Sequence, residues 1–415
     1  MKKLLFTLFG ALLTMVSLAQ LRLQHEDLPG QQSGKPRFTS ENGVGLVMPD
    51  SSFSVNFRFR MQSRALYFSR SGTDLGLSEI EAQIRRLRLR FEGFVVDPRL
   101  QYYIQLSFSR EDKDWTGEDI SSVNESPNTI RDAVIYYQAN KHVTLMFGQT
   151  KLPGNRQRVV SSGELQFYDR SIVNATFNID RDFGFQAYYH NNVEKVHYAL
   201  KGAVTSGDGR NVSTTPGGLA YSARVELLPL GQFSEPDPIL GGGYAEGDLA
   251  REETLRIAIG GGMSFNDRAR RQGAQIGLDL YEVRDIYTYF ADVLMKYQGF
   301  AFYSEFMKRT SPDPITVNAE GDIRHIITGH GLLLQTSYLF KNNLELAGRF
   351  AAIIPNAEIE SLQPEEHIYT LGLTRYLKKH RVKVQANISY ESTIATALDQ
   401  EDDNWMAGVQ VELGI

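Results

Sequence analysis

The sequence is dominated by segments in which apolar and polar residues alternate one by one. The clearest is IRRLRLRFEGF, residues 84–94. At 3.6 residues per turn its arginines scatter around a helix and no apolar face forms. In an extended strand, Arg86, Arg88 and Arg90 share one face, and the leucines and Phe91 occupy the other. The pattern therefore predicts a strand with one charged face and one apolar face.

Similar alternation recurs from residue 54 to the end of the chain, and the connections between the alternating runs are unequal. Short, turn-like connections alternate with long, polar ones. One connection on the short side, 229–253, is longer than this rule predicts. The short ones lie at 97–99, 138–141, 190–194, 297–299, 341–343 and 377–380, and the long ones at 70–81, 110–130, 150–181, 206–218, 266–286, 310–328, 354–366 and 392–403.

This arrangement predicts an all-β fold, a transmembrane antiparallel up-and-down β-barrel of about sixteen strands in the bacterial outer membrane. The runs of about 9 to 15 residues are long enough for tilted strands to cross the hydrocarbon layer. Both termini then lie on the periplasmic side. Several soluble β-sandwiches are the alternative, but they would have connections of similar length at both ends. No later segment offers an uncharged apolar run long enough for a transmembrane helix.

The first residues are typical of an export signal. Lys2 and Lys3 give a basic start, residues 4–16 form an apolar run, and residues 17–19 give a small-residue cleavage pattern. We therefore predict a cleavable signal peptide at 1–19, a periplasmic N-terminal extension at 20–53 and the barrel at 54–415. The chain has no cysteine, which excludes disulfides and thiolate chemistry. Its formal net charge of −5 gives no indication of a nucleic-acid partner.

In such a barrel the leucine face of residues 84–94 meets lipid and the arginine face meets the lumen. Arginine facing lipid at mid-bilayer costs roughly 2–4 kcal/mol per residue, so the reverse orientation is excluded. The preceding strand adds three arginines to the same inner face. Such a ladder in a low-dielectric wall concentrates anions and repels cations. The predicted pore-lining residues are Arg58, Arg60, Arg64, Arg86, Arg88 and Arg90.

Two features leave alternatives open. The arginines could instead brace the wall by pairing with inward acids, namely Glu92, Glu226, Asp292, Glu305 and Glu345. The third external loop, 150–181, is predicted to fold inward as a constriction, or else to be solvated or to bind lipopolysaccharide phosphates. The predicted constriction-loop residues are Lys151, Arg156, Arg158 and Arg170.

Several segments resemble the phosphate-selective porin O and P family: 85–108, 131–157, the neighbourhood of Arg170 and of 181–184, and 292–309. The resemblance implies a sixteen-stranded barrel, assembly as a homotrimer, basic residues along an anion path and an infolded third loop. The signal peptide and the start at Gln20 are similar to Bacteroidetes-type members. Two features depart from the family pattern: the third loop has few lysines, and the chain ends in Glu-Leu-Gly-Ile without a terminal aromatic residue.

The sequence thus predicts an outer-membrane porin for passive diffusion of small anions, with phosphate or polyphosphate as candidate solutes. Its partners would be outer-membrane lipid and lipopolysaccharide. The alternative function is a non-conducting structural or scaffold barrel that partners lipoproteins or secretion machinery. No HExxH motif, P-loop or nucleophile signature occurs, so neither an enzyme, a metal site nor a cofactor is predicted.

Overall fold

The computed structural model describes residues 37–39, 43–109, 129–212, 218–234, 244–395 and 400–415. The predicted signal peptide at 1–19, the first part of the N-terminal extension and most of the long connection at 110–130 lie outside these described residues. None of the helices in the described part of the chain is long and apolar enough to cross a membrane.

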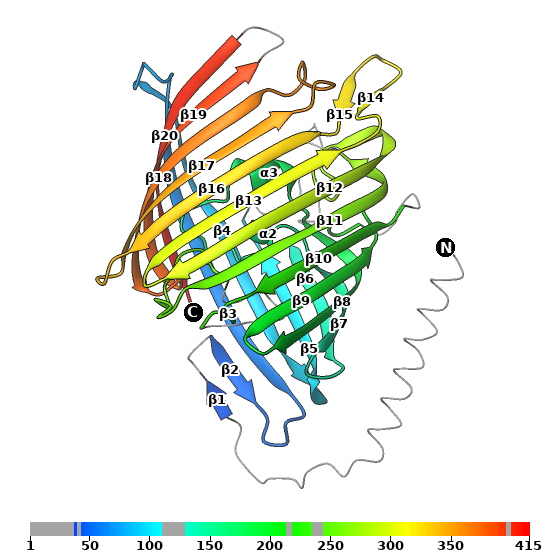
Figure 1. Ribbon diagram of the computed structural model, residues 1–415, viewed down its shortest axis with the longest axis vertical. Helices are drawn as coiled ribbons and strands as arrows, with labels where there is room; N and C mark the ends of the chain where they lie inside the picture. The colour runs from blue at the N-terminus through cyan, green and yellow to red at the C-terminus, as the bar shows by residue number, and fades with distance from the viewer. Residues whose placement is uncertain (1–36, 40–42, 110–128, 213–217, 235–243, 396–399) are drawn as a thin grey trace.

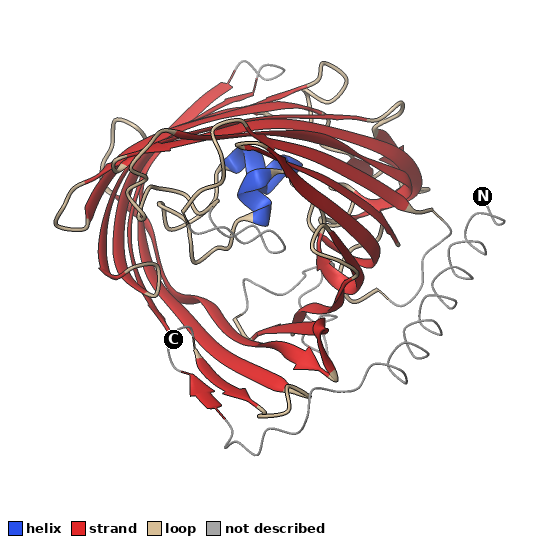
Figure 2. Ribbon diagram, turned by 60° about the horizontal axis from the view of Figure 1, so that its bottom comes forward, coloured by secondary structure: helices blue, strands red, loops and turns tan. Residues whose placement is uncertain are grey.

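Sixteen antiparallel strands of the described chain form a closed ring (Figures 1 and 2). Sequence neighbours pair with each other, and β20 pairs with β3 to close the barrel. The predicted meander is therefore confirmed. The strands are β3 (Ser54–Ser69), β4 (Leu77–Val95), β5 (Asp97–Ser107), β6 (Ile130–Gln138), β7 (Val143–Lys151), β8 (Arg181–Val193), β9 (Val196–Thr205), β10 (Ala220–Leu228), β11 (Arg256–Arg271), β12 (Asp279–Tyr297), β13 (Phe300–Thr310), β16 (Gly329–Leu339), β17 (Leu344–Pro355), β18 (Glu365–Lys378), β19 (Val382–Ala395) and β20 (Gln400–Gly414).

Two small hairpins lie beside the ring. β1 (Arg37–Thr39) pairs with β2 (Val44–Val47), and β14 (Ile315–Val317) pairs with β15 (Ile323–His325). β2 pairs with the first residues of β3, whereas β20 pairs with β3 from Arg60 onward. The β1–β2 hairpin therefore continues the wall just past the end of β20, as Figure 1 shows at its lower edge.

The outward faces of the strands are apolar and the inward faces are polar. Leu371, Val225 and Val409 are 62%, 55% and 49% exposed, while Arg86 and Arg88 are 3% and 7% exposed. This is the orientation that the alternation predicts, because lipid is an adequate solvent for aliphatic side chains but not for guanidinium groups. Hereafter the turn end is the end of the barrel with the short connections, such as 298–299, and the loop end is the opposite one.

Candidate channel and the loop inside it

The connection between β7 and β8, residues 152–180, contains two short helices that lie within the ring of strands in Figure 2. They are α2 (Arg156–Val159) and α3 (Ile172–Phe177). Ser171 caps α3, because its hydroxyl accepts a hydrogen bond from the amide of Asn174. We call residues 152–180 the third loop.

Apolar side chains attach the third loop to one side of the lumen. Leu152, Val173, Phe177 and Ile179 are each at most 2% exposed. Burial of apolar area of this kind is a main source of stability in water, and here it fixes the loop against the wall. Their partners are inward residues of β12, β13, β16 and β17, including Phe290, Tyr303, Met307, Leu333, Ala351 and Ile353.

Inward acids of the same wall bind the loop through hydrogen bonds. Glu305 accepts from Asn155 Nδ2 at 2.9 Å and from the Gln157 amide at 3.1 Å. Asp292 forms an ion pair with Arg156 of the loop. Glu345 accepts from the side chain of Gln166. Three of the five inward acids that could have neutralised the arginine strands, Asp292, Glu305 and Glu345, thus hold the loop.

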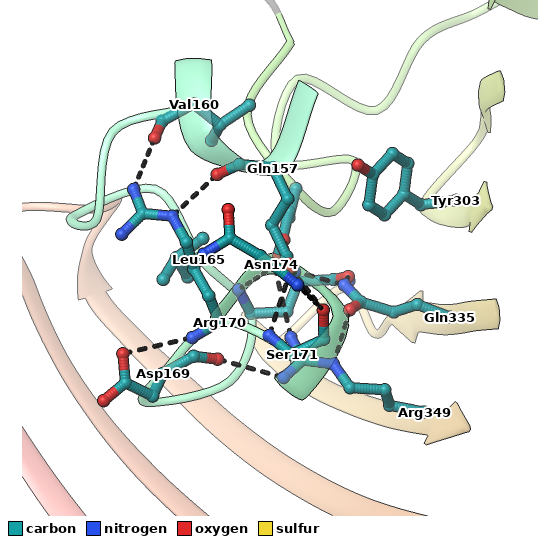
Figure 3. A network of polar contacts seen from close by, with 12 residues as sticks. Gln157, Val160, Leu165, Asp169, Arg170, Ser171, Asn174, Tyr303, Gln335 and Arg349 are labelled. Carbon is teal, nitrogen blue, oxygen red and sulfur yellow. Dashed lines mark hydrogen bonds and ion pairs between the residues drawn. The ribbon is translucent and has the colours of Figure 1, made fainter. Parts of the chain in front are cut away.

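Basic side chains of this wall bind backbone oxygens of the loop. Arg309 Nη1 donates to the Thr176 carbonyl at 2.9 Å, and Lys383 Nζ donates to the Leu165 carbonyl at 2.7 Å. Arg349 Nη1 donates to the Asp169 carbonyl at 3.0 Å (Figure 3). These cations satisfy carbonyl groups that short, irregular segments leave without partners. The third loop therefore lies against β12–β19 and faces β3 and β4 across the lumen.

Four of the predicted pore-lining arginines form two direct cross-strand pairs. Arg58 lies opposite Arg90, and Arg60 lies opposite Arg88. Arg58 and Arg90 share one carboxylate, Glu92. Arg60 Nη2 and Arg88 Nη1 donate to the Ser162 hydroxyl of the third loop at 2.8 and 2.9 Å. The ladder thus extends from the wall to the tip of the loop.

The next arginines converge on Asp169 of the third loop. Arg64 Nη1, Arg85 Nε and Arg86 Nη2 lie 2.9, 3.2 and 2.9 Å from its carboxylate oxygens. Burial raises the pKa of Asp169, but the charges of Arg86, Arg85 and Arg64 outweigh it and hold this pKa well below its ordinary value. Asp169 therefore stays ionised.

The sequence did not predict the contribution of Arg85. Strict alternation places it on the lipid face, but a β-bulge interrupts the pairing: Gln62 lies opposite Arg86, whereas Ser63 lies opposite Ile84. The extra residue, Arg85, turns inward to Asp169. The signal for this bulge is a change of phase in the alternation: the outward apolar residues lie at even positions up to Ile84 and at odd positions from Leu87.

The predicted constriction-loop cations mostly stabilise the loop itself. Lys151 Nζ donates to the carbonyl of Val159 at 2.6 Å, and Arg158 pairs with Asp180. Arg170 donates to the carbonyls of Gln157 and Val160, both at 2.7 Å (Figure 3). Arg156 points to the opposite side, toward Asp292.

Between the arginine strands and the third loop lies a cavity of about 480 Å³. Among the described residues, it is lined by thirteen arginines and two lysines but by four acidic side chains. Arg64 and Arg156 do not line it, although the other predicted basic residues do. The basic lining residues are Arg58, Arg60, Arg85, Arg86, Arg88, Arg90, Arg131, Lys151, Arg158, Arg170, Arg181, Lys201, Arg210, Arg224 and Arg381, and the acids are Asp132, Glu164, Asp180 and Glu412.

Several of these cations, such as Arg131, Lys201 and Arg381, are absent from the predicted ladder. Each is a single inward residue of its strand or turn, separated from the others in sequence. Only closure of the barrel brings them to one cavity. For the strand residues among them, the only available signal was an inward polar position after residue 130. That signal does not distinguish a residue that lines the channel from one that braces the wall.

Residues 54–246 match the model of a protein family described as phosphate-selective porin O and P. No curated protein sequence matches the chain. Among solved structures, OprB of Pseudomonas putida aligns with 12% identity over 87% of this chain and 94% of that one, with a TM-score of 0.53. The channel DcaP of Acinetobacter baumannii aligns with 10% identity over 88% and 98%, TM-score 0.51. An anion-selective porin from Comamonas acidovorans aligns with 11% identity over 87% and 100%, TM-score 0.50.

At these identities the structural matches concern the fold alone, and the family model matches residues 54–246, less than half of the chain. A closed sixteen-stranded barrel with a polar lumen is the architecture of a diffusion channel. The chain is therefore an outer-membrane porin, and its residues 54–246 are similar to the phosphate-selective porin O and P family.

Proposed function

We propose that this porin conducts small anions by passive diffusion, and that the third loop narrows the path. The observation that carries the proposal is the excess of basic over acidic side chains around the 480 Å³ cavity. A low-dielectric wall focuses the field of such charges and raises the local anion concentration. Conduction further requires weak, repeated contacts, which a series of arginines along two strands provides.

Pairing of arginines with acids does not remove this excess. Glu92 is shared by two arginines and Asp169 by three. Among the described residues, each of these carboxylates thus carries one negative charge against two or three guanidinium groups. The contacts therefore brace the wall and retain a positive potential, so that the two interpretations of the ladder are compatible.

The finer features of the proposal come from the sequence. Phosphate and polyphosphate are candidate solutes because guanidinium groups match the geometry of phosphate oxygens. The basic and apolar start of the chain supports a signal peptide at 1–19, and the family supports assembly as a homotrimer. The predicted start of the mature chain at Gln20 supports a Bacteroidetes-type member of the porin family.

The test of the proposed function is the reversal potential in a planar bilayer with a chloride salt gradient. We expect its sign to be that of an anion-preferring channel. A reversal potential of the cation-preferring sign would overturn the proposal. A folded barrel that shows no conductance, and that copurifies with a lipoprotein, would support the scaffold function instead.

Acidification should increase the anion preference through Glu164. This residue lies in the third loop and lines the cavity. Burial raises the pKa of its carboxyl above the ordinary 4.5, although Lys151 and Arg60 act in the opposite direction. As the pH falls from 7 through this raised pKa, Glu164 loses its negative charge and the cavity becomes more positive. Reversal potentials measured as the pH is lowered from 7 through this raised pKa should therefore move toward the value for a purely anion-conducting channel.

The matched control is Glu164→Gln, which is neutral at every pH. Its anion preference at pH 7 should already equal that of the parent channel at the acidic end, and it should change less with pH. Asp169 does not contribute in this range because its pKa is lowered. An equal pH dependence in both proteins would exclude Glu164 as the titrating group.

A further inference from the structure

The connection between β10 and β11 enters the barrel from the turn end. This connection is longer than the alternation of short and long connections predicts, and the sequence offers no reason for its length. In the structure its described residues 244–252 carry three carboxylates that are almost fully buried. Glu246, Asp248 and Glu252 are 3%, 0% and 2% exposed. Buried carboxylates require hydrogen-bond partners, and these partners show what the segment contacts.

The tip of this segment meets the third loop. The Glu246 amide donates to the Glu164 carbonyl at 3.1 Å, and the Gln166 amide donates to Glu246 Oε2 at 3.0 Å. Gln157 Nε2 donates to Glu246 Oε1 at 2.9 Å. Glu246 thus receives hydrogen bonds from both ends of the stretch 157–166, which includes the loop serines that contact Arg60 and Arg88.

Glu246 also connects this stretch to the wall. Gln335 Nε2 of β16 donates to Glu246 Oε2 at 3.1 Å, and Arg349 Nη2 of β17 lies 3.9 Å from the same oxygen. Beside it, the Tyr244 ring stacks 4.5 Å below the Arg156 guanidinium, and the Tyr244 hydroxyl donates to Glu226 at 3.3 Å. One buried carboxylate therefore joins the loop, the wall and the segment from the turn end.

The base of the segment is fixed to two turns. Asp248 accepts from the Glu252 amide at 3.1 Å and from the Gly299 amide at 2.7 Å, beyond the end of β12. Arg251 Nη2 donates to the Leu339 carbonyl at 2.6 Å, at the end of β16. Because its base is held in this way, the segment can hold the contacted part of the third loop in a fixed position relative to the turn end.

We propose that Glu246 is a positioning residue of the channel: from the turn end, it fixes the part of the third loop that faces the arginine strands. The width of the path is then set by two segments, one from each end of the barrel. The stretch 157–166 contains only the end of α2, a helix of 4 residues, and so short a helix does not hold its conformation alone. The assignment rests on the proposed channel only in so far as the third loop narrows it.

The test uses the absence of cysteine from the chain. A nitroxide attached at Val159→Cys, a partly exposed position of the stretch 157–166, reports the mobility of this part of the third loop in the full-length barrel. In Glu246→Ala we expect the mobile fraction of the label and the open-channel current noise to rise about twofold or more, because local opening becomes easier when its hydrogen bonds are lost. Heat-modifiable migration in detergent gels establishes that the barrel is folded.

Two further variants make the test selective. Glu253→Ala removes an exposed carboxylate of the same connection and should leave both readouts unchanged. Glu246→Gln keeps a carbonyl acceptor, and it should restore most of the rigidity; it also serves as the test variant if Glu246→Ala does not fold. Folded Glu246 variants with unchanged label mobility and noise would overturn the proposal. A cation-preferring reversal potential in the parent channel would overturn the anion function and leave this result interpretable.

Discussion

The triple substitution of Arg86, Arg88 and Arg90 by Gln should lower the anion-to-cation permeability ratio of the channel about fifteenfold. A unit charge about 8 Å from a permeating ion contributes roughly 0.5 kcal/mol in a water-like dielectric. Salt near 0.1 M reduces this by about half, because the Debye length is about 10 Å. Three lost charges then remove about 0.8 kcal/mol of attraction for an anion and about 0.8 kcal/mol of repulsion for a cation, together about 1.6 kcal/mol, which corresponds to a change of about fifteenfold in the ratio. The measurement is the permeability ratio from reversal potentials.

Two control variants show whether the permeability ratio follows the charge of the arginine strands. Asp169→Asn removes the carboxylate that three arginines share, so it should shift the permeability ratio toward anions. Arg99→Gln removes an arginine at the turn end whose side chain is 48% exposed and pairs with Asp97, so it should change the ratio little. If the triple variant keeps the parent ratio, the ladder serves to brace the wall and the other cations of the cavity set the selectivity.

The fold was predictable from the sequence because one physical constraint acts on every strand. Each strand must present apolar side chains to lipid and can place polar ones inside, so the alternation and the unequal connections specify the meander. The same constraint oriented Arg86, Arg88 and Arg90 correctly, and the cross-strand pairs Arg58–Arg90 and Arg60–Arg88 follow from the register of β3 and β4.

The interior was less predictable, because side chains inside a barrel obey no single pattern. Arg156 was expected at the constriction but reaches Asp292 on the far wall. Arg64 is inward but contacts Asp169 and does not line the cavity. Residues 244–252 have no periodicity, and their position depends on contacts with strands that are distant in sequence. Such contacts arise only when the barrel closes.

The second large effect should come from Asp292→Asn, which removes a central charge of a buried cluster. The Asp292 side chain is inaccessible and lies 2.7 Å from Arg224 Nη1, and it also pairs with Arg156 of the third loop. Glu226 is the other acid of the cluster, and it already pairs with Lys201 at 2.7 Å and with Arg224 at 2.7 Å. After the substitution, one carboxylate faces three buried cations.

Removing one partner of a buried ion pair typically costs 3–5 kcal/mol, since the remaining charge stays desolvated. We therefore expect Asp292→Asn to lower the free energy of unfolding by about 3 kcal/mol, measured by guanidinium unfolding of the barrel reconstituted in lipid vesicles. Glu282→Gln is the matched control: it lies on the same strand, its side chain is 62% exposed and it pairs with Arg284, so it should cost less than about 1 kcal/mol. Equal losses in both variants would mean that water reaches the cluster. In that case Asp292 and Arg156 would belong to the aqueous path together with Arg224, which lines the cavity, and the channel would extend behind the third loop.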